Sequence, residues 1–305
     1  MSLYSSYCAL CPRRCGADRA GGARGKCGAD DRLLVGRAAL HHWEEPPVSG
    51  TRGSGTVFFS NCPLRCVYCQ NYELSRGREG LAISVERLAD IFLELQDQGA
   101  HNINLVTATQ YVPAITAALR LVRPGKLHIP VICNTSGYET AYTLHKLDGL
   151  IDGYLFDLRY HSPELARRYS RAADYPQVAA AALEAALNQV GPYTLDAEGL
   201  LVSGVIVRLL LLPIPDGLVD ALAILRSTYA RYGDSVCYSL MNQYTPMLQT
   251  AERFPELSAQ VREEDYARLV EEALELGVAH SFMQEGDTVS ESFIPAFDGT
   301  GVMTL

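Results

Sequence analysis

Three cysteines lie close together in the stretch FFSNCPLRCVYCQN, which covers residues 58–71. Cys62, Cys66 and Cys69 follow a C-x3-C-x2-C spacing, directly after a short apolar run that is typical of a strand. Iron-sulfur clusters are held by cysteine thiolates, and a cluster of four irons normally uses four of them. Three thiolates leave one iron open, and an open position marks a site where a substrate or cofactor binds. The alternative is a structural zinc site with a distant fourth ligand, although zinc knuckles favour paired C-x2-C ligands.

Four further cysteines, Cys8, Cys11, Cys15 and Cys27, follow the spacing C-x2-C-x3-C-x11-C. Four thiolates close a metal site, so this group predicts either structural zinc or an auxiliary iron-sulfur cluster that relays electrons. A third reading leaves the thiols without metal, but this glycine-rich segment lacks the apolar neighbours of core cysteines. The remaining two cysteines, Cys133 and Cys237, stand alone in strand-like runs and are expected to pack in the core.

Composition limits the classes of protein that the chain can belong to. Its 305 residues, 48% hydrophobic and 20% charged, are enough for a large core, so disorder is not expected. The formal charge of -9 argues against nucleic acid as a partner, because binding to the phosphate backbone requires a basic surface. We find no segment of signal-peptide or membrane-spanning length. Seven of the nine cysteines are clustered, which is typical of metal ligands in a reducing compartment, so the expected location is the cytoplasm.

The elements that must position these cysteines alternate between strand and helix after residue 55. A helix is predicted after Ser84, which can cap it, with Leu88, Phe92 and Leu95 on one face and Gly99 at its end. Further helices are expected to follow Pro113, Glu139, Pro176, Leu218 and Arg262. The strand candidates are Thr56–Asn61, Ile103–Thr109, Ile129–Thr135, Gly153–Arg159, Val202–Leu212, Val236–Gln243 and Ala279–Glu285.

These alternating elements predict an α/β fold built as a partial or open (β/α) barrel of about six βα units. Several strand candidates are almost continuously apolar, as expected for strands that are covered on both faces. Residues 1–50 differ from the rest, because they are rich in Gly, Arg and Cys and show no clear period. We therefore expect a small cysteine-rich N-terminal segment at 1–50 and a barrel domain at 51–305. The first strand precedes Cys62, which places the cysteine triplet on a βα loop, where barrel enzymes build their sites.

The stretch CPLRCVYC resembles the signature of the radical S-adenosylmethionine superfamily. The resemblance covers most of residues 55–285 and is closest to the pyruvate formate-lyase activating enzymes and their uncharacterised iron-sulfur homologues. It implies that Cys62, Cys66 and Cys69 bind a 4Fe-4S cluster whose open iron chelates the amino and carboxylate groups of S-adenosylmethionine. It also implies that Tyr68 lies beside the adenine; ordinary core packing is the alternative role for this side chain.

Further positions match the family's cofactor site, with two departures. In CNTSG, Asn134 and Thr135 stand where the family has an Asp-Thr-Asn-Gly run, so that Asn134 replaces an acid. In FDLRY, which corresponds to an Asp-Leu-Lys run, the spacing of two puts both charged residues on one face of a strand. The usual Gly-Gly-Glu-type run is replaced by LVTATQY, which can supply hydroxyl and amide groups. The resemblance thus implies cofactor contacts from Thr107, Thr109, Gln110, Asn134, Thr135, Asp157, Arg159 and Arg208.

Arg208 can also be interpreted without any family. It lies inside the apolar run VIVRLLLL, where an unpaired buried guanidinium would be very costly. Asp157 on a neighbouring strand and the carboxylate of a bound cofactor are both candidate partners. A purely structural ion pair and a cofactor contact therefore remain open here.

The resemblance implies an enzyme that cleaves S-adenosylmethionine reductively and abstracts a hydrogen atom from a substrate. We identify no catalytic residue beyond the cluster and the cofactor, because the initiating step requires no acid-base pair or nucleophile. The implied target is a glycine of a glycyl-radical enzyme, and a flavodoxin or ferredoxin is the implied electron donor. Modification of another peptide or a small molecule is a second outcome of the same chemistry. A non-enzymatic iron-sulfur or zinc redox sensor is the third, but it does not explain three cysteines on a βα loop.

Overall fold

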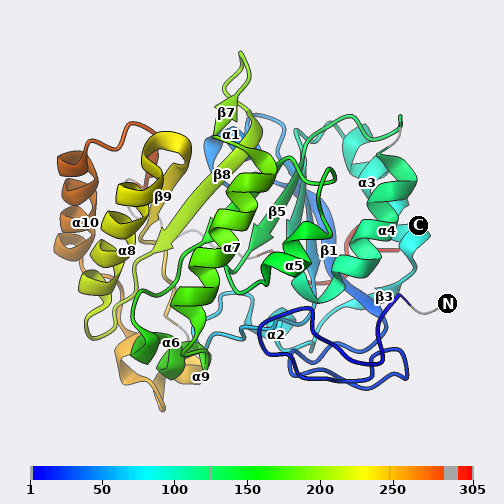
Figure 1. The fold of residues 1–305 in the computed structure, drawn as a ribbon, viewed down its shortest axis with the longest axis horizontal. Coiled ribbons are helices and arrows are strands. Elements are labelled where there is room, and N and C mark those ends of the chain that lie inside the picture. Colours follow the sequence, from blue (N-terminus) through cyan, green and yellow to red (C-terminus); the bar gives the residue numbers. More distant parts are fainter. Residues whose placement is uncertain (1–2, 124, 247, 285–294, 304–305) are drawn as a thin grey trace.

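The computed structural model describes residues 3–123, 125–246, 248–284 and 295–303. These residues form one ten-stranded sheet with the strand order β10-β9-β8-β6-β5-β4-β2-β1-β3, and β7 pairs only with β8. The neighbours from β2 to β10 along this order are all parallel. Because β10 and β3 lie at opposite edges, the barrel is open, as predicted (Figure 1).

All seven predicted strands are present, with ends that differ from the prediction by up to three residues. The strand interiors are buried on both faces, which explains their continuous apolar runs. The predicted end of the last strand, Glu285, lies outside the described residues. The strands are β1 Leu33–His41, β2 Ser54–Phe59, β3 Leu81–Ile83, β4 Ile103–Val106, β5 Val131–Thr135, β6 Gly153–Asp157, β7 Thr194–Leu195, β8 Leu201–Leu210, β9 Cys237–Met241 and β10 Ser281–Met283.

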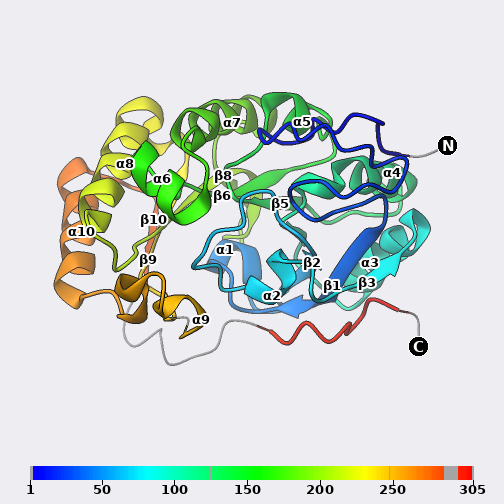
Figure 2. The same ribbon diagram turned by 90° about the horizontal axis from the view of Figure 1, so that it is seen from below.

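The longer helices cover the convex side of the sheet (Figure 2). The helix predicted after Ser84 is present, and the Ser84 hydroxyl accepts a hydrogen bond from the backbone N–H of Arg87. The helices are α1 Pro46–Ser49, α2 Tyr72–Ser75, α3 Val85–Asp97, α4 Val112–Val122, α5 Ala141–His145, α6 Pro163–Ser170, α7 Tyr175–Val190, α8 Gly217–Tyr232, α9 Leu248–Ala251 and α10 Glu263–Leu276.

Residues 33–50, which show no clear period in the sequence, form the strand β1 and the short helix α1. β1 pairs with β2 in antiparallel register, with Ala38 opposite Val57 and His41 opposite Ser54. The chain then enters the concave side of the sheet as α1, where Val48 is fully buried with Ile132 of β5. The hydrophobic pattern of this stretch shows no clear period, because the stretch holds a single strand and only one turn of helix. The domain boundary near residue 50 remains a prediction.

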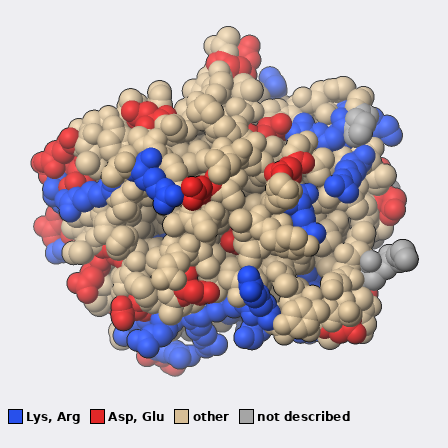
Figure 3. Space-filling model, in the orientation of Figure 1, with Lys and Arg blue, Asp and Glu red and all other residues tan. Residues whose placement is uncertain are grey.

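The chain before β1, residues 3–32, forms loops that lie beside α4 and α5 (Figure 2), where the Thr143 hydroxyl of α5 donates to the Leu10 carbonyl at 2.6 Å. Lys and Arg side chains gather along the lower edge of the face in Figure 3, where α6 carries Arg167 and Arg168 in its last turn. Acidic side chains gather at the left of this face, over α10, whose first turn carries three carboxylates. No helix among the described residues is long and apolar enough to cross a membrane.

Candidate functional site

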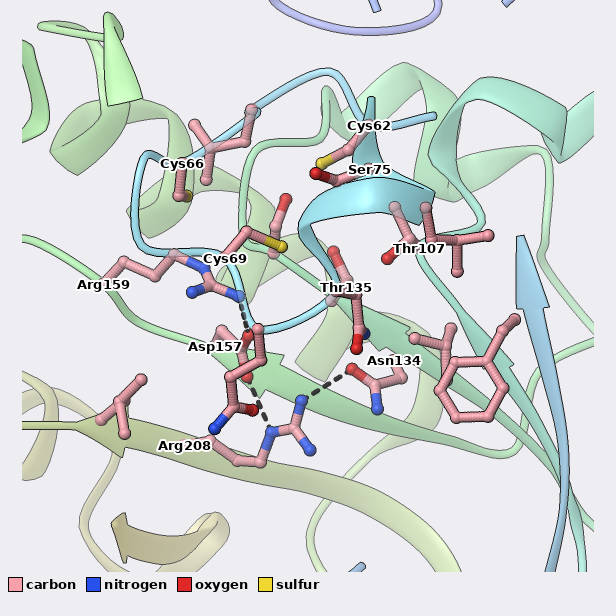
Figure 4. A pocket seen from close by; sticks show the side chains of 18 of the residues that line it. Cys62, Cys66, Cys69, Ser75, Thr107, Asn134, Thr135, Asp157, Arg159 and Arg208 are labelled. Carbon is pink, nitrogen blue, oxygen red and sulfur yellow. Dashed lines mark hydrogen bonds and ion pairs between the residues drawn. The ribbon is translucent and has the colours of Figure 1, made fainter. Parts of the chain in front are cut away.

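A cavity opens at the carboxyl ends of the parallel strands. Its walls come from the loop at 60–71, called the cysteine loop below, from the ends of β4, β5, β6, β8 and β9, and from residues before α1. Figure 4 shows the three cysteines on one side of this cavity and the polar strand ends on the other. The predicted site residues that line it are Cys62, Cys66, Tyr68, Cys69, Thr107, Asn134, Thr135, Asp157, Arg159 and Arg208.

The cysteine loop is held in place by its own neighbours. The Cys66 thiol accepts a hydrogen bond from the Ser170 hydroxyl at 3.0 Å, and the backbone N–H of Val67 donates to the Tyr169 carbonyl at 2.9 Å. Arg76 donates to the carbonyl oxygen of Arg65 at 3.1 Å. Because these bonds come from α6 and from the turn after α2, the loop is supported from both sides.

Cys62 and Cys66 are buried and Cys69 is half-buried. Desolvation raises the pKa of Cys62 to about 12 and also raises the pKa of Cys69. Metal binding requires thiolates, so a bound metal would have to displace the protons of these groups. Within the described ranges, no three carboxylate, imidazole or thiol groups surround one point as a single metal ion requires. A cluster binds each thiolate to a different iron, so thiols that share a wider cavity without converging on one point fit it better.

A network of charged side chains forms the polar side of the cavity. Arg208 donates through Nε to Asp157 at 2.7 Å, through Nη2 to Asn134 Oδ1 at 2.7 Å and through Nη1 to Glu44 at 3.0 Å. Asp157 is paired on its other oxygen with Arg159. Burial alone would lower the pKa of Arg208, but the surrounding carboxylates outweigh it and raise the pKa. The acid partner expected for Arg208 is therefore present, and the guanidinium stays charged.

Glu44 is the site residue that sequence reasoning missed. Its other carboxylate oxygen accepts hydrogen bonds from Asn104 at 2.9 Å and from Asn134 at 3.3 Å. Glu44 lies just before α1, and α1 is buried against the concave side of the sheet. This placement brings the Glu44 carboxylate to residues of β4, β5 and β8. The only sequence signal was the need of Arg208 for negative charge, which did not indicate where the second acid would come from.

Two of the lining residues have unusual environments. Thr107 has a φ of 61°, a left-handed conformation that is strained for a β-branched residue, and such strain is frequent at functional sites. Tyr68 is almost fully buried, its ring packs edge-on against Tyr160, and burial raises the pKa of its hydroxyl. Tyr68 thus stays neutral beside the cysteine thiols.

Thr109 and Gln110 do not line the cavity, in contrast to what the resemblance implied. The Thr109 hydroxyl donates to the buried carboxyl of Glu139 at 2.6 Å. The Gln110 amide nitrogen lies within hydrogen-bond distance of the carbonyl oxygens of Ser60, Asn61 and Thr107, at 2.8–3.0 Å. The short 3-10 turn at Thr109–Tyr111 points both side chains away from the cavity, and Gln110 braces the start of the cysteine loop.

The four N-terminal cysteines line a second, smaller cavity, which Arg13, Arg19 and Lys26 also line. As in the main cavity, the thiols of the described residues do not surround one point as a single metal ion requires. An ideal Cβ at Gly25 would lie 3.3 Å from Cys15 Sγ and 3.4 Å from Cys27 Sγ, so a larger residue there would press against these two thiols. Burial raises the pKa of Cys11 to about 12 and raises that of Cys27. For Cys15, hydrogen bonds from backbone N–H groups outweigh burial and lower the pKa.

The second cavity borders the cysteine loop. Pro63 lines it, and Arg13 donates to the carbonyl oxygen of Pro63 at 3.1 Å. On the other side, Arg65 of the loop donates to the Lys26 carbonyl at 3.3 Å. The two groups of cysteines are therefore separate sites that share one wall.

Comparison with known proteins identifies relatives of this chain. Residues 56–195 match the family model of the Radical SAM superfamily. The uncharacterized protein MJ0674 of Methanocaldococcus jannaschii is 27% identical over 175 residues, which are 55% of this chain and 50% of that protein.

A solved structure with a similar fold is HydG, described as a maturase of the FeFe hydrogenase. The TM-score is 0.50 at 16% identity, over 73% of this chain and 49% of that one. At this identity the similarity concerns the fold alone. This chain spans about half the length of both the curated relative and the solved structure.

Proposed function

Because residues 56–195 match the family model of the Radical SAM superfamily, we propose that this chain is an enzyme that binds a 4Fe-4S cluster and S-adenosylmethionine in the main cavity. The observation that carries the proposal is the convergence of the three loop thiols and the polar strand ends on one cavity. Within the described ranges the cavity presents three thiols, which suits a cluster with one iron left open for the cofactor.

When bound, the cluster supplies the electron that splits S-adenosylmethionine into methionine and a 5′-deoxyadenosyl radical, which takes a hydrogen atom from the substrate. The residues of the chain position these groups and exclude water. Cys62, Cys66 and Cys69 hold the iron, while the buried Tyr68 provides an apolar wall beside it. We propose no acid-base residue for this step.

The charged network suggests different roles for its two arginines, Arg208 and Arg159. All three nitrogens of Arg208 are already bonded within the protein, so Arg208 orients Asp157 and Asn134. Arg159 retains a buried Nε without a hydrogen-bond partner among the described residues. Arg159 also lies near Cys69 (Figure 4), so we assign to it the carboxylate of the cofactor, with Thr107, Thr135 and Asn134 near the remaining polar groups. Thr109 and Gln110 support the site from outside the cavity.

For the substrate we propose a glycine of a glycyl-radical enzyme, on the strength of the resemblance to activating enzymes. Modification of another peptide or of a small molecule is the second candidate. The electron donor would be a flavodoxin or ferredoxin in the cytoplasm. We also propose that Cys8, Cys11, Cys15 and Cys27 hold a second metal centre, either zinc or an auxiliary iron-sulfur cluster, because all four line one cavity.

The test is anaerobic reconstitution with iron and sulfide, followed by reduction and addition of S-adenosylmethionine. We expect 5′-deoxyadenosine from the wild-type chain and none from Cys69→Ala, which should also lose about four irons per chain. Cys133→Ala is the matched control, because Cys133 is a buried strand thiol that does not line the cavity. Retained cleavage in Cys69→Ala would refute the assignment.

A non-enzymatic redox sensor is the competing function. It predicts that the reconstituted cluster changes its oxidation state reversibly but neither binds nor cleaves S-adenosylmethionine. Binding of the cofactor by the wild-type chain, with loss of binding in Cys69→Ala, would reject the sensor function.

A further inference from the structure

Arg19 is a buried cation in the N-terminal segment, and only 1% of its surface is exposed. Its guanidinium lies 3.8 Å from the centroid of the Tyr4 ring. Nε donates to the Asp30 backbone carbonyl at 2.8 Å, and Nη1 donates to the Gln110 backbone carbonyl at 2.6 Å. Nη2 is buried and has no hydrogen-bond partner among the described residues.

No carboxylate compensates this charge within the described part of the chain. The acid closest in contact, Asp30, offers Arg19 only its backbone oxygen. The Asp30 carboxylate is instead paired with Arg32 at 2.8 Å and with Arg24 at 3.8 Å. A buried charge without a counter-ion is costly in proteins, and the π contacts with Tyr4 and, at 5.9 Å, with Tyr111 offset only part of that cost. The fold therefore requires a negative charge near Arg19.

The cavity that Arg19 lines contains Cys8, Cys11, Cys15 and Cys27. On metal binding, each of the four thiols loses one proton to solvent and becomes a thiolate. Four thiolates around one divalent ion leave a net charge of about -2, and a cluster with four cysteine ligands is likewise anionic.

We infer that Arg19 is the buried counter-ion of an anionic tetrathiolate metal centre formed by these four cysteines. The inference rests on the second metal centre proposed above and adds the residue that compensates its charge. Arg19 also connects this centre to the main site, because it donates to the backbone of Gln110, whose side chain braces the cysteine loop. Arg19 is thus a positioning residue and not a metal ligand.

The experiment uses the full chain in a Cys69→Ala background, which leaves all four N-terminal cysteines in place. The variants are Arg19→Met, which removes the charge, and Arg19→Lys, which keeps it. Arg24→Met is the control, because Arg24 lies in the same segment with its side chain 70% exposed. Co²⁺ and Zn²⁺ titrations followed by thiolate-to-metal absorption report a single-ion site, and iron and sulfide counts after anaerobic loading report a cluster.

Whether the site binds a single metal ion or an iron-sulfur cluster, Arg19→Met should lower the affinity of the site for it about 10- to 100-fold, as loss of a group supporting metal ligands does. Arg19→Lys and Arg24→Met should stay close to the background chain. The melting temperatures provide a second readout with opposite signs. Arg19→Met should lower the melting temperature of the metal-loaded protein but raise that of the metal-free protein, because the uncompensated buried charge is gone.

Two results would overturn the inference. If Arg19→Met lowers both melting temperatures equally with unchanged metal affinity, Arg19 only packs. If the background chain binds neither metal nor cluster, the second centre does not exist and the inference falls with it. Neither readout involves cleavage of S-adenosylmethionine, so failure of the radical chemistry leaves this test intact.

Discussion

At the scale of single residues, the main site depends on buried charges that compensate one another. Glu44 and Asp157 both contact Arg208, and Arg159 contacts Asp157. Two guanidinium groups and two carboxylates thus form one network without net charge. Removing one member of a buried network leaves another unpaired, which costs more than the lost contact itself.

Glu44→Gln tests this network. The change removes one negative charge and places an amide where three donors now converge, so we expect the free energy of unfolding to fall by about 2 kcal/mol. Urea denaturation of the metal-loaded protein measures it. In the control Glu73→Gln, the lost partner is the exposed Arg78, and solvent screening should make the cost much smaller. Equal effects in the two variants would show that burial of the Glu44 network adds nothing.

At the scale of elements, the side chains at the strand ends form one part of the site. The cysteine loop forms the other part and is held by hydrogen bonds to its backbone. The parallel register brings Asp157 of β6 directly opposite Arg208 of β8. The cysteine loop has no such ladder, and its first residues depend on the Gln110 side chain. A side chain after β4 thereby fixes the loop after β2.

Gln110→Leu should weaken this brace. The leucine fills a similar volume but donates no hydrogen bond, so three carbonyl oxygens lose a donor and stability should fall by about 3 kcal/mol. We also expect iron to be lost from the cysteine loop during gel filtration, measured as iron per chain. The control is Gln177→Leu on the exposed surface of α7. Full retention of iron by Gln110→Leu would contradict the proposed brace.

At the scale of the whole molecule, the segment at 295–303 closes the outer side of β1. Ala38 donates its N–H to the Thr300 carbonyl at 2.9 Å, and Gly299 donates to the Gly36 carbonyl at 3.0 Å. Arg87 of α3 holds the Val302 carbonyl at 2.9 Å, and Val302 is fully buried. The segment therefore connects the edge of the open barrel to the first long helix.

Gly301→Ala should detach this segment. Gly301 has a φ of 70°, and an added Cβ would lie 2.0 Å from the Ala38 carbonyl oxygen, so the backbone must move. Gly199→Ala is the matched control, with a φ of 79° and no atom within 4 Å of the added Cβ. Both variants should lose about 1 kcal/mol from backbone strain, with a larger loss for Gly301→Ala. Limited proteolysis should cut Gly301→Ala faster near the C-terminus, and equal cutting rates would contradict this role.

The sequence alone determined the features that depend on local spacing. The cysteine triplet, the alternation of strands and helices and the need of Arg208 for an acid all follow from residues a few positions apart. The apolar run that marks a strand is a local property of the sequence, so the seven predicted strands were located to within three residues. The pairing of Arg208 with Asp157 was also within reach, because neighbouring strands of a parallel sheet bring their ends together.

Only the tertiary structure decided which distant groups meet. Glu44 reaches the main site because α1 is buried against the concave side of the sheet. The hydrophobic pattern around Glu44 does not indicate this placement. Gln110 turns away from the cavity because a single 3-10 turn follows β4. Arg19 meets the four cysteines only once the N-terminal loops have closed around them. The physical reason is common to all three: spacing along the chain sets the face on which a side chain lies, whereas its partner is set by packing between segments far apart in sequence.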